Sequence, residues 1–294
     1  MSIELAPHNK RGLTLTSPLI AGCGAVGFGA DWPPGLSPEM FGAIVTAPVS
    51  LHSRRGSPQP RFAELPGGFL LATGDHNPGY RRVIREHSQI WLSLAGPPGS
   101  RGAPGRREQI PVVMALASST PEDWARLAAL VETEMGIAGL ELCLPHETGV
   151  AAASAWIGAV RRVTELPLIV KLPTVQARSF AEASAAAGAD ALVVGTPPFG
   201  AFPAGGGWVT APVSGPIAYP FTLQALRAIA SRGLSLPLVA AGGIHNAEDA
   251  QRCLDEGASA VQVRSLLWID PASAARLAEA MRGAGAAETP HPDP

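Results

Sequence analysis

Eight short apolar segments, each followed by a turn and a stretch with helical spacing, constrain the fold of this chain most. They lie at 18–22, 43–47, 111–116, 138–144, 167–171, 190–195, 237–241 and 259–263. Each is apolar on both faces, which is typical of parallel strands covered by helices. Eight such units in 294 residues favour a closed barrel over a doubly wound sheet, which usually has fewer strands. The sequence therefore predicts an α/β fold of the (β/α)8 TIM barrel type.

The remaining segments set the expected domain organisation. Helix starts are expected at Thr120, Asn246 and Asp270, where a capping residue precedes a segment with helical spacing. We expect one domain over 1–282, a mobile excursion at 96–109, a long Pro/Gly-rich loop at 197–220 and a disordered tail at 283–294. That long loop carries aromatic side chains that need the core, a ligand or a partner chain to pack on; they are Phe199, Phe202, Trp208 and Tyr219.

Charge and hydropathy exclude several classes of function. Lys and Arg number 22 against 24 Asp and Glu, so no basic field is available to hold a nucleic-acid backbone. No apolar run reaches the ~20 residues that span a bilayer, and the N-terminus lacks the pattern of a signal peptide. We expect a cytoplasmic protein. The three widely spaced cysteines, Cys23, Cys143 and Cys253, are expected to be reduced thiols, and no metal site is predicted.

In a barrel of this type the active site lies at the carboxyl ends of the strands, so the residues just after each apolar segment are the candidates. Gly242-Gly243 follow the seventh segment and Arg264-Ser265 follow the eighth. Together these turns are typical of a phosphate cradle built from backbone N–H groups. Alternatively, the two glycines serve only tight packing, and Arg264 pairs with an acidic side chain.

Three further side chains are candidates for chemistry. Lys171 ends a fully apolar segment, where its ammonium could serve an electron-rich cofactor ring, act as a Schiff-base amine or simply be solvated. His146 follows the fourth segment and suits a catalytic acid or base, unless it is structural or exposed. Cys23 is interpreted as a small buried residue rather than a ligand-facing thiol. The polar groups of 75–79 are expected mainly to form a turn and cap a helix.

The order of motifs resembles the FMN-dependent dihydroorotate dehydrogenases over residues 13–280. The segments that carry the resemblance are SPLIAGCGAVGFG (17–29), FGAIVT (41–46), the hairpin 55–61, PGGFLLATGDHNPG (66–79), GLELCLP (139–145), PLIVKL (167–172), SGP (214–216) and VAAGGIHNAEDAQRCLDEGASAVQV (239–263). The last of these is the most specific, because it joins the glycine turn to the following helix and strand. The resemblance implies an FMN-binding barrel, often a homodimer, that moves a hydride between a substrate C–C bond and flavin N5.

The resemblance also implies roles for cofactor-binding residues. Lys171 matches the lysine at the flavin pyrimidine edge, and Gly242 and Gly243 match the phosphate glycines. Ser265 stands where a Gly-Thr pair completes the phosphate site, and Arg264 places a bulky side chain where the family has glycine. The other cofactor-binding positions that match are Gly22, Cys23, Gly24 and Gly215.

The substrate half departs from the family. Ala47 replaces its lysine after the second strand, and Leu71 replaces an asparagine. Cys143 stands in the segment whose asparagines and base Cys or Ser are absent here, and Gly195 or Thr196 replaces a further asparagine. Leu71, Asn77, Cys143 and Thr196 are therefore the substrate-binding candidates, in a site that lacks the amides expected to hold orotate.

His146 falls on the base position in an ungapped alignment and is predicted, with Lys171, to be catalytic. The leading hypothesis is an FMN-dependent oxidoreductase acting on a CH–CH group of a small molecule other than orotate. One rival is a lyase or isomerase that uses Lys171 as a Schiff-base amine. Another is a non-catalytic barrel that binds flavin without turnover. The electron acceptor is open between oxygen, fumarate, a quinone, a nicotinamide cofactor and a partner protein.

Overall fold

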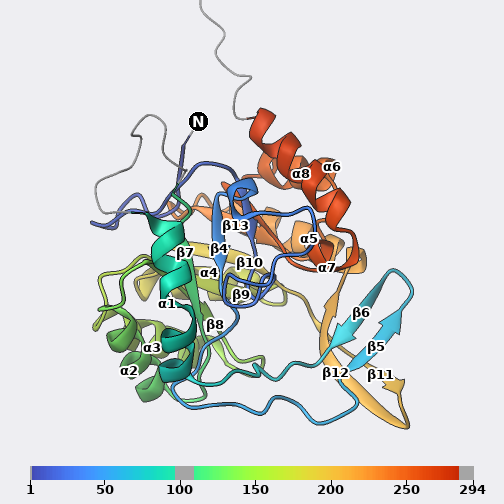
Figure 1. The fold of residues 1–294 in the computed structure, drawn as a ribbon, viewed down its shortest axis with the longest axis horizontal. Helices are drawn as coiled ribbons and strands as arrows, with labels where there is room; N and C mark the ends of the chain where they lie inside the picture. The colour runs from blue at the N-terminus through green and yellow to red at the C-terminus, as the bar shows by residue number, and fades with distance from the viewer. Residues whose placement is uncertain (1, 97–108, 285–294) are drawn as a thin grey trace, which may run out of the picture.

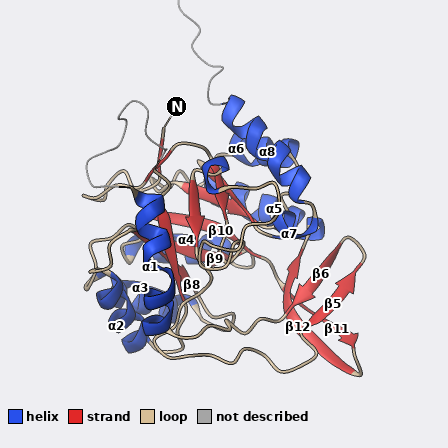
Figure 2. Ribbon diagram, in the orientation of Figure 1, coloured by secondary structure: helices blue, strands red, loops and turns tan. Residues whose placement is uncertain are grey.

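The structure, a computed structural model that describes residues 2–96 and 109–284, has a closed barrel of eight parallel strands at its centre (Figures 1 and 2). The strands follow one another around the barrel in the order β10-β13-β14-β3-β4-β7-β8-β9. Every predicted segment contains or overlaps one of them, which confirms the (β/α)8 prediction. They are β3 (Leu19–Ala21), β4 (Ala43–Val45), β7 (Val112–Leu116), β8 (Ile137–Cys143), β9 (Leu168–Pro173), β10 (Ala191–Thr196), β13 (Leu238–Ala241) and β14 (Ala260–Val263).

Helices surround the barrel. They are α1 (Tyr80–Ala95), α2 (Pro121–Val131), α3 (Val150–Arg161), α4 (Ala177–Ala186), α5 (Tyr219–Ala230), α6 (Ala247–Asp255), α7 (Ser265–Ile269) and α8 (Pro271–Ala284). The predicted caps form, since the side chains of Thr120 and Asn246 accept hydrogen bonds from backbone N–H groups three residues ahead. The repeat is imperfect in one place: between β3 and β4 stands only the 3₁₀ helix η1 (Pro38–Met40), because the proline-rich segment 33–38 cannot continue an α-helix.

The barrel interior and the layer between strands and helices are two separate apolar cores. Alternate residues of each strand point inward, so Ile20, Val113 and Val193 pack inside while their neighbours along the strand face the helices. A short hairpin of β1 (Ile3–Glu4) and β2 (Thr14–Leu15) contributes Leu5 and Leu13 to the interior core. This hairpin closes the barrel at the end opposite the carboxyl ends of the strands.

The prediction of a loop over 197–220 is wrong. Strands β11 (Phe199–Ala204) and β12 (Gly207–Ser214) form a hairpin that joins β5 (Phe62–Leu65) and β6 (Gly68–Leu71) in a four-stranded antiparallel sheet beside the barrel (Figure 1). Alternate residues Val209 and Ala211 are buried against Ala63 and Leu70. β11 lies at the sheet edge, where the proline it contains removes no internal ladder bond.

The two segments predicted to be mobile or disordered fall largely outside the described residues. Residues 97–108, within the predicted excursion 96–109, and residues 285–294 lie outside them. The predicted tail begins two residues too early, since Gly283 and Ala284 still belong to α8. Among the helices of 2–96 and 109–284, none combines the length and apolarity needed to cross a membrane.

Candidate functional site

A cavity of about 360 Å³ opens at the carboxyl ends of the barrel strands, under the small sheet. Its volume lies in the range of small-molecule sites. Most residues proposed from the sequence line it together, although they come from many separate elements. Those that do are Gly22, Cys23, Leu71, Cys143, His146, Lys171, Thr196, Gly215, Gly242, Gly243, Arg264 and Ser265.

Lys171 and Gln262 line the cavity, and with the fully buried Glu141 beneath them they form a polar cluster. The ammonium of Lys171 lies 3.3 Å from Glu141 Oε1 and donates a hydrogen bond to Gln262 Oε1 at 3.1 Å. The Gln262 amide in turn donates to Glu141 Oε2 at 2.6 Å. Since Glu141 is fully buried, its carboxylate depends on these two donors to replace water. The three side chains are held as one unit.

This cluster fixes the protonation of Lys171. Burial lowers the pKa of its ammonium. The neighbouring charge of Glu141, together with Cys23 and Cys143, raises the pKa by more than burial lowers it. The net result is a pKa above the ordinary lysine value. Lys171 therefore presents a positive charge to the cavity at neutral pH.

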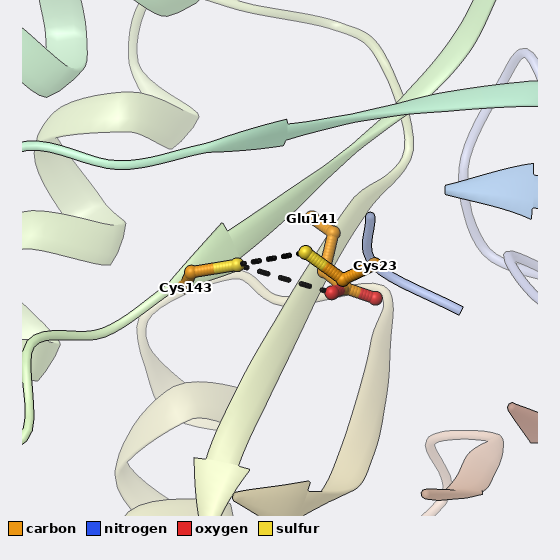
Figure 3. A group of neighbouring side chains, drawn as sticks. All are labelled: Cys23, Glu141 and Cys143. Atoms are coloured by element: carbon orange, nitrogen blue, oxygen red, sulfur yellow. Dashed lines mark hydrogen bonds between the residues drawn. The ribbon is translucent and has the colours of Figure 1, made fainter. Parts of the chain in front are cut away.

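Two thiols meet next to the cluster. The sulfurs of Cys23, after β3, and Cys143, at the end of β8, lie 3.8 Å apart. Cys143 Sγ also lies 3.9 Å from Glu141 Oε1, and Figure 3 shows all three side chains converging. The hydrogen bond with Cys23 and burial raise the pKa of the Cys143 thiol well above its ordinary value. Cys23 is buried, as expected, but it also faces the cavity.

The glycine turn after β13 is closely packed. Gly242 and Gly243 have φ angles of 106° and 75°, and a Cβ on Gly243 would lie 2.2 Å from the backbone nitrogen of Tyr219. The turn is thus tightly packed. Both glycines also line the cavity, so the same turn can bind an anion there. Only glycine fits at Gly243.

Ser265 begins α7 beside this turn. The first N–H groups of a helix have no partner inside it, which leaves them available to an anion. His245 Nε2 lies 2.9 Å from Ser265 Oγ and ties the start of α7 to the glycine turn. Burial lowers the pKa of His245, so the neutral imidazole can accept this hydrogen bond from the hydroxyl.

Arg264 stands where the resemblance places a glycine, but the backbone at this position does not require one. Its φ is −132°, open to any residue, and its guanidinium carbon lies 5.1 Å from the centroid of the Trp268 ring. Nearby, Asp75 lines the cavity and pairs with Arg54 at 3.2 Å. Burial raises the pKa of Asp75, against the smaller opposing effects of Arg54 and Arg264. Arg264 thus adds a cation to the cavity wall and has an acidic neighbour.

His146 lies at the edge of the cavity on the loop after β8. It is exposed, and its ring centroid lies 3.7 Å from that of Phe199 in β11. The small sheet therefore contacts the predicted base. Of the aromatic residues proposed to need a partner, Phe199 packs on His146 and Tyr219 belongs to α5, whereas Phe202 and Trp208 are exposed.

Two predicted site residues do not line the cavity. Gly24 lies against the backbone of Ala47. Asn77 is buried in the turn before α1, where its amide donates to Ser50 Oγ and to the carbonyl of Asp75 and its oxygen accepts from the N–H of Gly79. These bonds use the Asn77 side chain for the turn expected at 75–79, whereas the expected cap does not form, because α1 has Gly79 at its N-cap position and no side-chain cap.

Glu141 and Gln262 are site residues that the sequence reasoning did not single out. A signal was available: each is a polar residue inside an otherwise apolar strand. Each also falls on the inward side in the alternation of its strand, with Cys143 two residues after Glu141. Thr210, Pro212 and Ser214 of β12 also line the cavity and were hidden by the loop prediction.

Comparison with known proteins agrees with this architecture. A family model described as dihydroorotate dehydrogenase matches residues 7–283. The catalytic subunit of dihydroorotate dehydrogenase B (NAD(+)) from Desulforudis audaxviator is 34% identical, over 91% of this chain and 88% of its own. The proteins of the same name from Pelobacter propionicus and a Geobacillus species are 34% and 30% identical, over 93% and 88% of this chain and 91% and 84% of their own. The chain belongs to the dihydroorotate dehydrogenase family.

Proposed function

We propose that this protein is an FMN-dependent oxidoreductase that acts on a CH–CH group of a small molecule other than orotate. One observation carries the proposal: the Lys171 ammonium, the Gly242-Gly243 turn and the start of α7 line a single cavity. These groups fit a ligand with an anionic end and an electron-rich ring. FMN, when bound, supplies the hydride chemistry of this site.

The chain's own residues divide the work of binding. Backbone N–H groups of Gly242, Gly243 and Ser265 would hold the phosphate, and Arg264 adds positive charge to the same wall. Lys171, kept protonated by Glu141, would place its charge against the ring. A fixed cation at that position favours negative charge developing on the ring.

The substrate side of the cavity supports a less polar ligand than orotate. Leu71, Phe199 and Pro212 line it, and Cys143 and Thr196 stand where the family resemblance places amides. His146 would take or give the substrate proton, because an imidazole can both accept and donate a proton and its ring is held at the cavity edge by Phe199. A site without the amide donors loses its means of selecting a pyrimidine.

The Schiff-base alternative finds no support in the geometry. A lysine that attacks a carbonyl must lose its proton, and Glu141 raises the pKa of Lys171 instead of lowering it. The non-catalytic alternative differs from our proposal in one measurable property, since it predicts bound flavin that no donor reduces.

The wider organisation is proposed on similar grounds. We expect residues 1–282 to act as one FMN-binding domain and the chain to form a homodimer in the cytoplasm. The relatives are named catalytic subunits of an NAD(+) enzyme, which favours a nicotinamide cofactor, reached through a partner subunit, among the possible electron acceptors.

Release of the chromophore tests the cofactor. The purified protein should be yellow, and denaturation should release one FMN per chain, identified by mass. A colourless protein that takes up no added FMN would contradict the proposal. With FMN bound, anaerobic mixing with candidate CH–CH donors should bleach the flavin absorbance for at least one of them, and flavin that no donor reduces would favour the non-catalytic alternative.

A matched pair of variants tests the base. His146→Ala should slow bleaching by about 10²-fold to 10⁴-fold, the usual contribution of a general base. His8→Ala, at an exposed residue near the N-terminus, should leave the rate unchanged. If His146→Ala bleaches at the wild-type rate, His146 is not the base.

A further inference from the structure

The two thiols that line the cavity and the buried carboxylate of Glu141 next to them have the composition of a metal-ligand set. One atom each from Cys23, Glu141 and Cys143 lies within 4.8 Å of the other two, and Figure 3 shows the three side chains pointing toward one another. We propose that this cluster is a binding site for a thiophilic divalent cation, with zinc as its natural occupant. The proposal goes beyond the flavin chemistry, and it uses Cys23 and Cys143, which line the same cavity.

Two of the three spacings between the ligand atoms are close to those of a zinc tetrahedron, and the third, between Cys23 and Glu141, is no longer than 4.8 Å. With Zn–S bonds of ~2.3 Å and a Zn–O bond of ~2.1 Å, tetrahedral angles place two sulfurs ~3.8 Å apart and a sulfur ~3.6 Å from the oxygen. The Cys23 and Cys143 sulfurs are 3.8 Å apart, and Cys143 Sγ lies 3.9 Å from Glu141 Oε1. An ion can therefore enter with small adjustments of the side chains.

The neighbours of the cluster complete it. Gln262 donates a hydrogen bond to Glu141 Oε2, the carboxylate oxygen that the ion would leave free, and Lys171 lies 3.3 Å from Oε1, the oxygen that the ion would share with it. Two thiolates and one carboxylate carry a charge of −3, which a divalent cation and the Lys171 ammonium balance to zero. Such balance matters because an uncompensated charge in this buried position is costly.

The fourth corner of the tetrahedron faces the cavity, since Cys23 and Cys143 both line it. Three protein ligands with one open position are typical of catalytic zinc sites, in which water or a substrate oxygen takes the last place. The inferred ion would thus present a Lewis-acidic position to whatever occupies the cavity. The wide spacing of the cysteines along the chain predicted no metal site, but the barrel brings Cys23 and Cys143 together across its interior.

Metal titration of the reduced protein tests the site. The chain, freed of metal by a chelator and kept reduced by a phosphine, should show three titratable thiols. It should then bind one Co²⁺ per chain, with thiolate-to-cobalt charge-transfer absorbance, and Zn²⁺ should displace it. Binding should release two protons per ion, because two thiols are deprotonated on ligation.

Matched cysteine variants locate the ion. Cys23→Ser and Cys143→Ser should each abolish the charge-transfer band. Cys253→Ser, which removes the buried thiol of α6, should keep it. Gln262→Leu should weaken binding by about 10-fold to 100-fold, as is usual when the partner that orients a ligand is lost. In the wild type, Zn²⁺ should also protect Cys23 and Cys143 from alkylation, a readout that needs no variant to fold.

Three results would overturn the proposal. They are the absence of a cobalt band in the fully reduced wild type, a band that survives Cys23→Ser, and unchanged alkylation of the two thiols in excess zinc. Flavin content is read separately from visible absorbance and released mass. Metal binding by a protein that never takes up FMN would therefore support this site and contradict the proposed function, and the converse would contradict this site alone.

Discussion

Removing the charge of Glu141 should change how the free energy of unfolding depends on pH. Through Lys171, this free energy falls at high pH in the wild type and should rise with pH in the variant. In the native protein Glu141 is fully buried, lies 3.3 Å from the ammonium, and raises the pKa of Lys171 above its ordinary value. A raised pKa gives stability that is fully present below the unfolded value of ~10.4 and is lost only as pH rises through the folded value. Lys171 therefore adds no slope near neutral pH in the wild type.

Glu141→Gln keeps the shape of the side chain and removes its charge. Burial, which is the largest influence on Lys171, then acts without its main counterweight, and the pKa of the ammonium falls below its ordinary value. Breaking a buried pair in this way costs about 3–5 kcal/mol at neutral pH. Because the unfolded lysine now binds more protons than the folded one, stability must rise with pH, by up to about 1.4 kcal/mol per pH unit.

Urea unfolding between about pH 7 and pH 9 measures this slope as the change in unfolding free energy. The control is the double variant Glu141→Gln with Lys171→Met, which keeps every thiol and carboxylate of the single variant but lacks the ammonium. We expect the single variant to show the steeper positive slope, with the difference approaching about 1.4 kcal/mol per pH unit. Parallel curves for the two variants would refute the assignment of Glu141 as the group that keeps Lys171 protonated.

Three further predictions concern other parts of the molecule. Gly243→Ala should abolish FMN uptake, measured by absorbance of the purified protein, because the new Cβ would lie 2.2 Å from the backbone nitrogen of Tyr219; normal uptake would show that the turn can shift. Asn77→Ala should lower the free energy of unfolding by about 1–3 kcal/mol in urea titrations with FMN affinity unchanged, since it leaves buried partners unpaired; a loss of affinity instead would return Asn77 to the site. If the exposed aromatic residues of the small sheet form a homodimer contact, Trp208→Ser with Phe202→Ser should shift sedimentation from dimer to monomer, and an unchanged dimer would place the contact elsewhere.

The barrel could be predicted because its signal is local. The barrel strands are buried on both faces and most are followed by an α-helix, two of which begin at the capping side chains of Thr120 and Asn246, so the pattern can be found without knowledge of distant contacts. The small sheet could not be found this way. β12 pairs with β6 through Val213 and Leu70, which are far apart in the chain, and the glycines and prolines around β12 hide its alternation.

The same distinction explains the site. Lys171 and the Gly242-Gly243 turn were recognised because each stands at the end of an apolar segment, although β9 continues two residues past Lys171. The partners of Lys171 were missed because a hydrogen bond between β9 and β14 depends on the register of the closed barrel, not on spacing in the chain. Cys143 pairs in register with Lys171 on the adjacent strand. Cys23, which follows β3, contacts Cys143 across the barrel interior.

The polar cluster of Lys171, Glu141 and Gln262 is best explained by the charged groups that it holds in place at the cavity, not by a contribution to the stability of the fold. Replacing a buried ion pair by apolar side chains of similar volume is often neutral or stabilising by about 1–4 kcal/mol, so stability alone gives little reason for Glu141 and Lys171 in an apolar barrel. Their hydrogen bonds to Gln262 fix one ammonium and one carboxylate at the carboxyl ends of three strands. The ammonium faces the cavity as a permanent cation, and the carboxylate faces two thiols. The two proposals made for this cavity, a flavin ring beside Lys171 and a metal ion beside Glu141, thus use the two ends of one buried pair.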